Sequence, residues 1–99
     1  MLFYTQIIFL KTGMENSFNV FESNMLPILQ KHNGKLLYRI RITKESIIEA
    51  IDQPHEIHII EFQSKKDFES YINDQERAKH LNLKEQSVKK IQLIEGKLI

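Results

Sequence analysis

The chain has 99 residues, of which 41% are hydrophobic and 27% are charged, and its formal net charge is +1. This length predicts one domain, residues 1–99, and this composition is typical of a soluble globular protein. The balanced charge gives no overall reason to expect nucleic acid or a membrane surface as a partner. Because there are no cysteines, disulfides, thiolate catalysis and zinc–cysteine sites are excluded.

The first apolar run, Phe3 to Leu10, predicts an interior β-strand, because aromatic and β-branched residues occupy both of its faces. The run has no basic residue before it and lacks a small-residue cleavage pattern, so we do not interpret it as a signal peptide. It is also too short to span a bilayer. We therefore expect a cytoplasmic location.

The next segment predicts an amphipathic helix that Asn16 or Ser17 would cap. Pro27 lies inside the pattern and should kink or restart the helix, because its ring crowds the preceding turn. Asn33 and Gly34 should close the helix, with Gly34 in the left-handed conformation of a C-cap. The residues at helical spacing are Phe18, Phe21, Met25, Leu29 and His32.

The segment from Lys35 to Ile42 alternates and predicts a strand with two different faces. Segment 43–53 is harder to interpret, although its isoleucines suggest a short extended piece before Pro54. One face of the predicted strand carries Leu36, Tyr38, Ile40 and Ile42, and the other carries Leu37, Arg39 and Arg41.

A buried strand followed by a capped helix is predicted from 56 to 73. Glu56 to Phe62 is apolar enough on both faces to be a central strand. Ser64 stands where an N-cap belongs, so the helix should begin near Lys65. The helical positions that should face the sheet are Phe68, Tyr71 and Ile72.

The remaining chain predicts one more helical segment and one more strand. The segment from Asp74 to Ser87 is more polar, and its inner positions should be Ala78, Leu81 and the neighbouring Val88. Lys90 to Ile99 alternates as a strand does, with Gly96 at an expected bulge or bend.

The predicted order of strands and helices is βαββαβ, which indicates an α+β, ferredoxin-like fold with an antiparallel four-stranded sheet. Its first and third strands should lie in the centre, because they are apolar on both faces, whereas the second and fourth carry charges that suit edges. Helices cover one face of such a sheet. The other face is too apolar for water, so we expect it to associate with a second sheet.

Three segments resemble the DUF1330 family of the dimeric α+β barrel superfamily. They are LPILQKHNGKLLYR from Leu26, IIEAIDQPHEIHIIEFQSKKDFESYINDQER from Ile47, and IQLIEGKL from Ile91. The resemblance implies a homodimer, a dimeric α+β barrel in which two sheets meet face to face.

The resemblance also assigns individual positions. The His-Gly-Gly turn of the family matches His32-Asn33-Gly34, its strand arginine matches Arg39, and its Glu-Phe-Pro-Ser matches Glu61-Phe62-Gln63-Ser64. Asn33 and Gln63 depart from the family pattern. The stretch from Asp74 to Arg77 also departs from it, because the family has Ser-Pro-Glu-Tyr there.

Four residues are candidates for a site, and each has a structural alternative. His32 could be a catalytic base, since imidazole changes charge near neutral pH, or it could simply interact with a helix C-terminus. Arg39 and Glu61 could bind a small acidic metabolite, or Arg39 could form a structural pair with Glu61. His58 fits a hydrogen-bonded core residue better than a metal ligand, and the histidine spacing predicts no metal site.

Two functions remain open at this level. The first is a small-molecule-binding protein or cofactor-free enzyme with its cavity between sheet and helices, because superfamily relatives include monooxygenases, isomerases and heme-dependent enzymes. The second is a non-catalytic homodimerisation module. No glycine-rich phosphate loop, nucleophile elbow or dinucleotide fingerprint is present.

Overall fold

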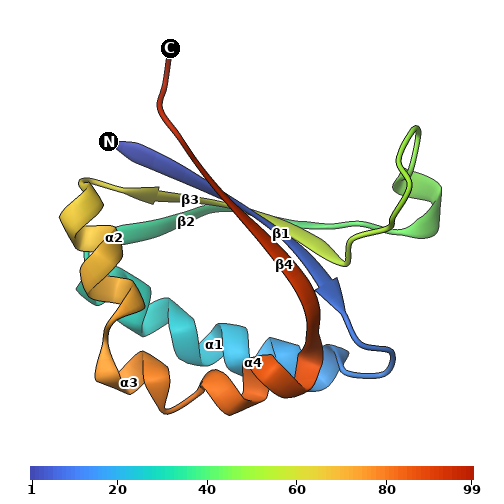
Figure 1. Cartoon of the computed structure of the whole chain (residues 1–99), viewed down its shortest axis with the longest axis horizontal. Helices are drawn as coiled ribbons and strands as arrows, with labels where there is room; N and C mark the ends of the chain where they lie inside the picture. The colour runs from blue at the N-terminus through green and yellow to red at the C-terminus, as the bar shows by residue number, and fades with distance from the viewer.

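The computed structural model describes residues 1–99 and contains one antiparallel sheet with all of its α-helices on the same side of it (Figure 1). The strand order β2-β3-β1-β4 places the first and third strands in the centre, and the predicted ferredoxin-like fold is confirmed. None of the helices is both long and apolar enough to cross a membrane. The strands are β1 (Leu2–Leu10), β2 (Gly34–Arg41), β3 (Glu56–Phe62) and β4 (Val88–Gly96), and the helices are α1 (Glu15–Lys31), η1 (Lys44–Ser46), α2 (Lys65–Ile72), α3 (Gln75–Ala78) and α4 (Leu81–Ser87).

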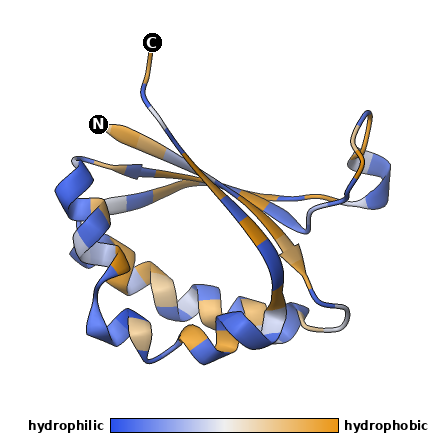
Figure 2. Ribbon diagram, in the orientation of Figure 1, coloured by the Kyte–Doolittle hydropathy of each residue, from blue (hydrophilic) through white to orange (hydrophobic).

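The core lies between the helices and the side of the sheet that faces them. Strand residues alternate between faces, so Leu2, Tyr4, Gln6 and Ile8 of β1 point to the helices along with their β3 partners. Apolar residues run along most of β1 (Figure 2). Ten buried apolar side chains form the core: Tyr4, Ile8, Phe18, Phe21, Met25, Ile28, Leu29, Ile60, Phe62 and Tyr71.

The predicted strand-to-helix unit is confirmed by β3 and α2. The Ser64 hydroxyl accepts a hydrogen bond from the backbone N–H of Asp67 at 3.1 Å, which satisfies a donor that the first helical turn leaves free. Phe68 stacks on Tyr4 with ring centroids 4.0 Å apart, and Phe62 meets both rings edge-on. These aromatic contacts fix α2 to the two central strands.

Helix α1 differs from the prediction at its start and at its proline. It begins at Glu15 with Met14 as N-cap, so neither Asn16 nor Ser17 caps it. An acidic side chain in the first turn interacts favourably with the helix dipole, which compensates in part for the missing cap. The helix does not restart at Pro27, because this residue lies on the exposed side, where a helix tolerates the lost hydrogen bond most easily.

The end of α1 corrects the predicted roles of Asn33 and Gly34. Asn33, with φ 60°, takes the left-handed conformation, which asparagine tolerates better than most residues. Gly34 instead begins β2 and is required for space. A Cβ atom there would lie 2.5 Å from Leu29 Cδ1 and 2.7 Å from Phe62 Cε1, too close for any side chain.

A β-bulge at Leu37 changes the faces of β2. Leu36 pairs with Ile60, but the next pair is Tyr38 with Ile59, so Leu37 is an extra residue. The predicted strict alternation was therefore wrong. Leu36 lies on the same face as Arg39 and Arg41, toward the helices, whereas Tyr38 and Ile40 lie on the opposite face (from the pairing with β3).

Two further segments and the last glycine differ from the prediction. Residues 47–53 form no extended strand, because after the short turn η1 they have no neighbouring strand to pair with. Segment 74–87 is two short helices, α3 and α4, rather than one, and Ala78 is exposed. Gly96 ends β4 instead of forming a bulge, and the irregularity between β1 and β4 lies at Phe9 and Leu10.

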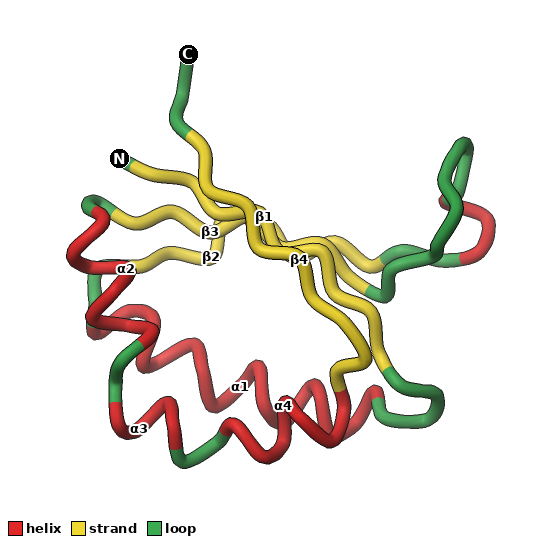
Figure 3. The backbone as a smooth tube through the Cα atoms, in the orientation of Figure 1, coloured by secondary structure: helices red, strands yellow, loops and turns green.

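The sheet side away from the helices has no covering layer in the chain (Figure 3). We call it the open face, and Tyr38 on it is 63% exposed. The loop after β2 and the C-terminal tail extend to this same side, each with fully or largely exposed apolar residues, namely Ile48 and Ile51 in the loop and Leu98 and Ile99 in the tail. The strand pairing gives the apolar members of the open face as Phe3, Ile7, Phe9, Tyr38, Ile40, Ile57, Ile59 and Ile94.

Candidate functional site

A buried acidic residue and a buried histidine lie next to each other under α1. Glu56 and His58 are two residues apart on β3, so both point toward the helices, and each is only 1% exposed. His58 Nε2 lies 2.8 Å from Glu56 Oε1. Charged groups are rarely buried to this extent unless they are paired, so their other partners determine what they can do.

Two arginines of β2 neutralise Glu56. Arg39 donates from Nε and Nη2 to the two carboxylate oxygens at 2.6 and 2.9 Å, and Arg41 donates from Nη2 at 2.8 Å. Burial alone would raise the pKa of Glu56, but the hydrogen bonds from His58, Arg39 and Arg41 outweigh it and hold this pKa well below its usual range. Glu56 is therefore an ionised acceptor. Arg39 is held in addition by Asn19 Oδ1 of α1 at 2.8 Å.

The ionised Glu56 determines the tautomer of His58. A carboxylate only accepts hydrogen bonds, so the Nε2 of His58 carries the proton that it donates to Glu56. In the neutral imidazole, Nδ1 then carries a lone pair that can accept a proton. Nδ1 lies 3.8 Å from Glu22 Oε2, close enough for electrostatic interaction but beyond hydrogen-bond distance. Burial raises the pKa of Glu22, opposed by the nearby His58 and Arg39.

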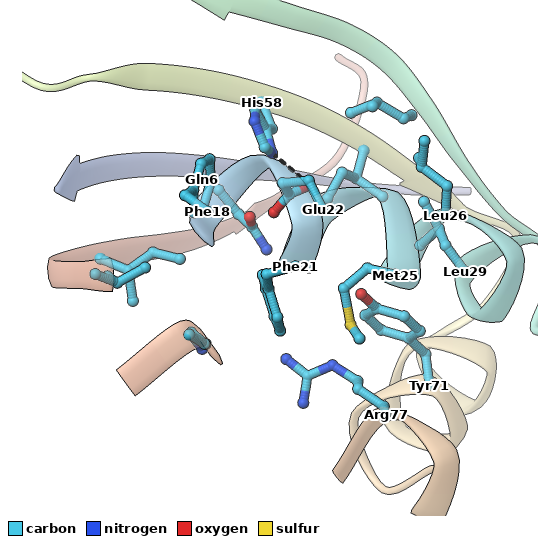
Figure 4. A pocket seen from close by; sticks show the side chains of 15 residues that line it. Gln6, Phe18, Phe21, Glu22, Met25, Leu26, Leu29, His58, Tyr71 and Arg77 are labelled. Atoms are coloured by element: carbon cyan, nitrogen blue, oxygen red, sulfur yellow. Dashed lines mark ion pairs between the residues drawn. The ribbon is translucent and has the colours of Figure 1, made fainter. Parts of the chain in front are cut away.

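His58 and Glu22 border a small cavity between α1, α3, α4 and the sheet (Figure 4). Its volume is about 30 Å³, enough for one or two water molecules. Ten of its fifteen lining residues are apolar, and Glu22 is the only acidic one. An apolar space with a few convergent polar groups is typical of a ligand site.

Two cationic residues line the same cavity from the side opposite the sheet. Arg77 of α3 is only 9% exposed, and its guanidinium lies over the ring of Tyr71 at 5.0 Å from the centroid. Its Nε has no hydrogen-bond partner, and Nη1 makes one long contact of 3.4 Å to the carbonyl of Ile72. Lys84 of α4 is partly buried. Its pKa is lowered mainly by burial and secondly by the positive charge of the nearby Arg77.

The predicted pairing of Arg39 with Glu61 was wrong. Arg39 pairs with His58 in the strand register and faces the helices, whereas Glu61 lies opposite Lys35 and Phe3 and belongs to the open face. The partner of Arg39 is Glu56. That Arg39 and Glu61 bind a ligand stays a prediction, but the two side chains do not share one site.

His32 lies at the far end of α1 from Arg39. Its Nε2 is 2.6 Å from Asp74 Oδ2, and this contact is the first cause of the lowered pKa of Asp74. Asp74 also caps α3, so the pair joins the end of α1 to the start of α3. His32 follows Asn19, which touches Arg39, by thirteen residues, or about 20 Å along the helix. A catalytic role for His32 stays a prediction.

Sequence reasoning missed Glu22, Glu56, Arg77 and Lys84. A signal for Glu56 was present, because a charged residue and a histidine two positions apart in an apolar strand must share one face. Arg77 and Lys84 gave no comparable signal, since helical spacing does not distinguish an inward cation from a solvated one. No group of three or more histidine and carboxylate side chains is arranged to hold a metal ion.

Comparison with known proteins places the chain by fold alone. No family model matches it, and a search of curated proteins finds no match. Among solved structures, the RPA0582 protein of unknown function from Rhodopseudomonas palustris is 14% identical with a TM-score of 0.87, covering 99% of this chain and 80% of that one. A DABB family protein with a ferredoxin-like fold from Mesorhizobium loti is 17% identical with a TM-score of 0.72, covering 99% and 96%.

A third structure is described as a dimeric protein of unknown function with a ferredoxin-like fold, from Bacteroides fragilis. It is 10% identical with a TM-score of 0.71, and the match covers 98% of this chain and 95% of that one. Identities this low leave the chain's site residues without a counterpart of known role. The descriptions of the last two structures name a ferredoxin-like fold, and this chain shares that fold.

Proposed function

We propose that the protein binds a small organic molecule in the cavity beneath α1 and moves a proton on it without a cofactor. The observation that carries this proposal is His58, whose Nε2–H is held by the ionised Glu56 while Nδ1 faces Glu22 beside the cavity. A base oriented by a buried carboxylate is the arrangement that general acid–base catalysis requires.

The two carboxyl groups near His58 have opposite tasks in this proposal. Glu56 stays ionised, because the arginines and His58 hold its pKa low, and it orients the imidazole. Glu22 holds a proton more readily than an ordinary glutamate, because burial raises its pKa. Two carboxyl groups whose pKa values are shifted in opposite directions are typical of acid–base sites. His58 Nδ1 accepts the proton of the bound molecule, and Glu22 serves as the acid.

Arg39 supports this site rather than contacting the bound molecule. Its guanidinium donates to both oxygens of Glu56 and to Asn19, and it does not line the cavity. Arg39 therefore holds the carboxylate of Glu56 in the position that orients His58. A positioning role of this kind requires a planar donor fork, which lysine lacks.

A panel of small metabolites tested for ligand-dependent melting is expected to contain compounds that stabilise the protein. A ligand at a hundred times its Kd adds about 2.7 kcal/mol. For each such compound, incorporation of deuterium from D₂O, followed by NMR, reports proton transfer. We expect His58→Gln and Glu22→Gln to slow this exchange by roughly 10²- to 10⁴-fold.

The control for this experiment is Glu69→Gln, because Glu69 is exposed on α2 and does not line the cavity. Glu22→Gln should fold as the wild type does, because Glu22 makes no hydrogen bond that the substitution would break. A slower exchange in this variant would therefore report on the site and not on folding. Exchange that continues unchanged in both cavity variants would refute the acid–base role. If no compound of the panel stabilises the protein, the alternative, a non-catalytic association module, is favoured.

We also infer that two copies pair through their open faces as a dimeric α+β barrel, as the DUF1330 resemblance implies. The open face gathers eight large apolar side chains, a patch that proteins rarely leave in water. The exposed Ile48 and Ile51 of the loop after β2 extend on the same side. The description of the Bacteroides fragilis structure as dimeric supports this inference.

Sedimentation at micromolar concentration is expected to give twice the chain mass of 11.8 kDa. Ile59→Lys, in the middle of the open face, should shift the protein to the single-chain mass, because it buries a charge in the contact. Val20→Lys, an equal substitution at an exposed position on α1, should leave the mass unchanged. A wild-type protein that sediments at 11.8 kDa would exclude this dimer.

A further inference from the structure

The cavity contains more positive charge than its own residues neutralise. Arg77 and Lys84 both line it, yet neither forms an ion pair with any carboxylate of the chain. Glu22, its only acidic residue, holds a proton more readily than usual, because burial raises its pKa. Buried cations are normally paired, so this arrangement requires another source of negative charge.

Arg77 has the free donors that such a group would use. Its side chain extends from α3 toward Phe21, next to Tyr71 and Met25 (Figure 4). Nε is buried and unpartnered, and the one bond from Nη1 is long. A buried donor without a partner is costly to the folded protein, which favours a bound acceptor at this position. A guanidinium edge matches the two oxygens of a carboxylate.

Lys84 reinforces the same preference from α4. Burial and then repulsion by Arg77 lower its pKa. Both cations line the cavity, so an anion between them would offset their repulsion. Arg77 and Lys84 reach the cavity from α3 and α4, whereas His58 reaches it from β3 and Glu22 from α1. In Figure 4, Arg77 lies across the cavity from His58 and Glu22.

We propose that the cavity takes a small carboxylic acid, whose carboxylate binds Arg77 and Lys84 and whose remainder lies against Glu22 and His58. This inference rests on the proposed function and names its class of ligand. This inference places the anion site at Arg77, whose Nε has no partner, and at Lys84, rather than at Arg39, whose Nε and Nη2 donate to Glu56 and Asn19. The volume of about 30 Å³ limits the ligand to a few heavy atoms unless the α3–α4 segment moves outward.

The test is an NMR titration with acetate and with its neutral analogue acetamide, at constant ionic strength set by chloride. The Nε–H signal of Arg77, assigned by its loss in Arg77→Met, is expected to shift saturably with acetate and not with acetamide or chloride. Arg77→Met and Lys84→Met should each weaken acetate binding at cavity amides about tenfold or more, since a charge-assisted hydrogen bond is lost. Lys79→Met, at an exposed position after α3, should leave the affinity unchanged.

The two proposals fail in different ways. If acetamide shifts the cavity signals as strongly as acetate, or if both methionine variants bind acetate like the wild type, the carboxylate inference is overturned and the proposed cavity site stands. If neither molecule shifts signals of the cavity and no metabolite of the panel binds there, the cavity is not a ligand site and both proposals fall.

Discussion

Replacing Glu56 by Ala is expected to lower the free energy of unfolding by about 3–5 kcal/mol. The substitution leaves Arg39, Arg41 and His58 without the carboxylate that they share, and His58 is almost completely buried. A buried polar group that loses its hydrogen-bond partner keeps the cost of its desolvation without compensation. Urea unfolding at neutral pH, followed by circular dichroism, measures the loss.

The matched control is Glu49→Ala, because Glu49 is exposed in the loop after β2 and forms no ion pair. It should change stability by under about 0.5 kcal/mol. If Glu56→Ala lowers the free energy of unfolding no more than Glu49→Ala does, the buried charges contribute no more to stability than surface charges. Glu56→Gln keeps the side-chain volume and separates the effect of charge from that of packing.

The pH dependence of stability gives an independent check on Glu56. Its pKa is lower in the folded protein than in the unfolded chain, so its contribution is complete above the usual carboxyl range and is lost as the pH falls below about 4. The difference between wild type and Glu56→Ala should shrink accordingly. Glu22 acts in the opposite direction, because its raised pKa makes the folded state less stable as the pH rises through that value.

Phe62→Ala is expected to cost about 3–5 kcal/mol of unfolding free energy. Phe62 is fully buried and lies at the centre of an aromatic cluster, with ring centroids 5.7 Å from Tyr4 and 5.6 Å from both Phe68 and Tyr71. Truncation leaves a cavity between β1, β3 and α2 and removes three contacts between rings, two edge-on and one tilted. Thermal and urea unfolding measure the loss.

Two other residues of the same unit provide a graded comparison. Phe68 is only partly buried, so Phe68→Ala should cost less than Phe62→Ala, and Glu69→Ala, on the exposed side of α2, should cost under about 0.5 kcal/mol. A loss at Glu69 as large as that at Phe62 would mean that α2 presents a different face to the sheet.

The fold could be predicted because its strongest signals are local. Central strands apolar on both faces, a serine at the start of α2 and a helical stripe on α1 each indicate one structure, and together they leave one strand order. The errors occurred where tertiary packing decides. Gly34 is needed for the space between Leu29 and Phe62, which no turn pattern reveals. Helix α3 begins at Gln75 because the side chain of Asp74 caps it, accepting from the backbone N–H groups of Glu76 and Arg77.

The candidate site was predicted only in part, for a physical reason. Arg39 was named as a candidate, but its partner depends on register, and the extra residue Leu37 in β2 decides that it faces Glu56 rather than the open face. Arg77 belongs to a helix of four residues, too short for periodicity to indicate which side faces inward. The register between two strands and the packing of a short helix on the core depend on residues far apart in the sequence. A local sequence pattern therefore predicts them poorly.

The bulge at Leu37 lets β2 contain one residue more than its pairing with β3 uses. Tyr38 and Arg39 pair with Ile59 and His58, which are the partners that strict alternation after Leu36 would give them if Leu37 were absent. A single-codon deletion of Leu37 in evolution would therefore remove the bulge and leave Arg39 and Arg41 beside Glu56, so β2 should tolerate the loss of this residue.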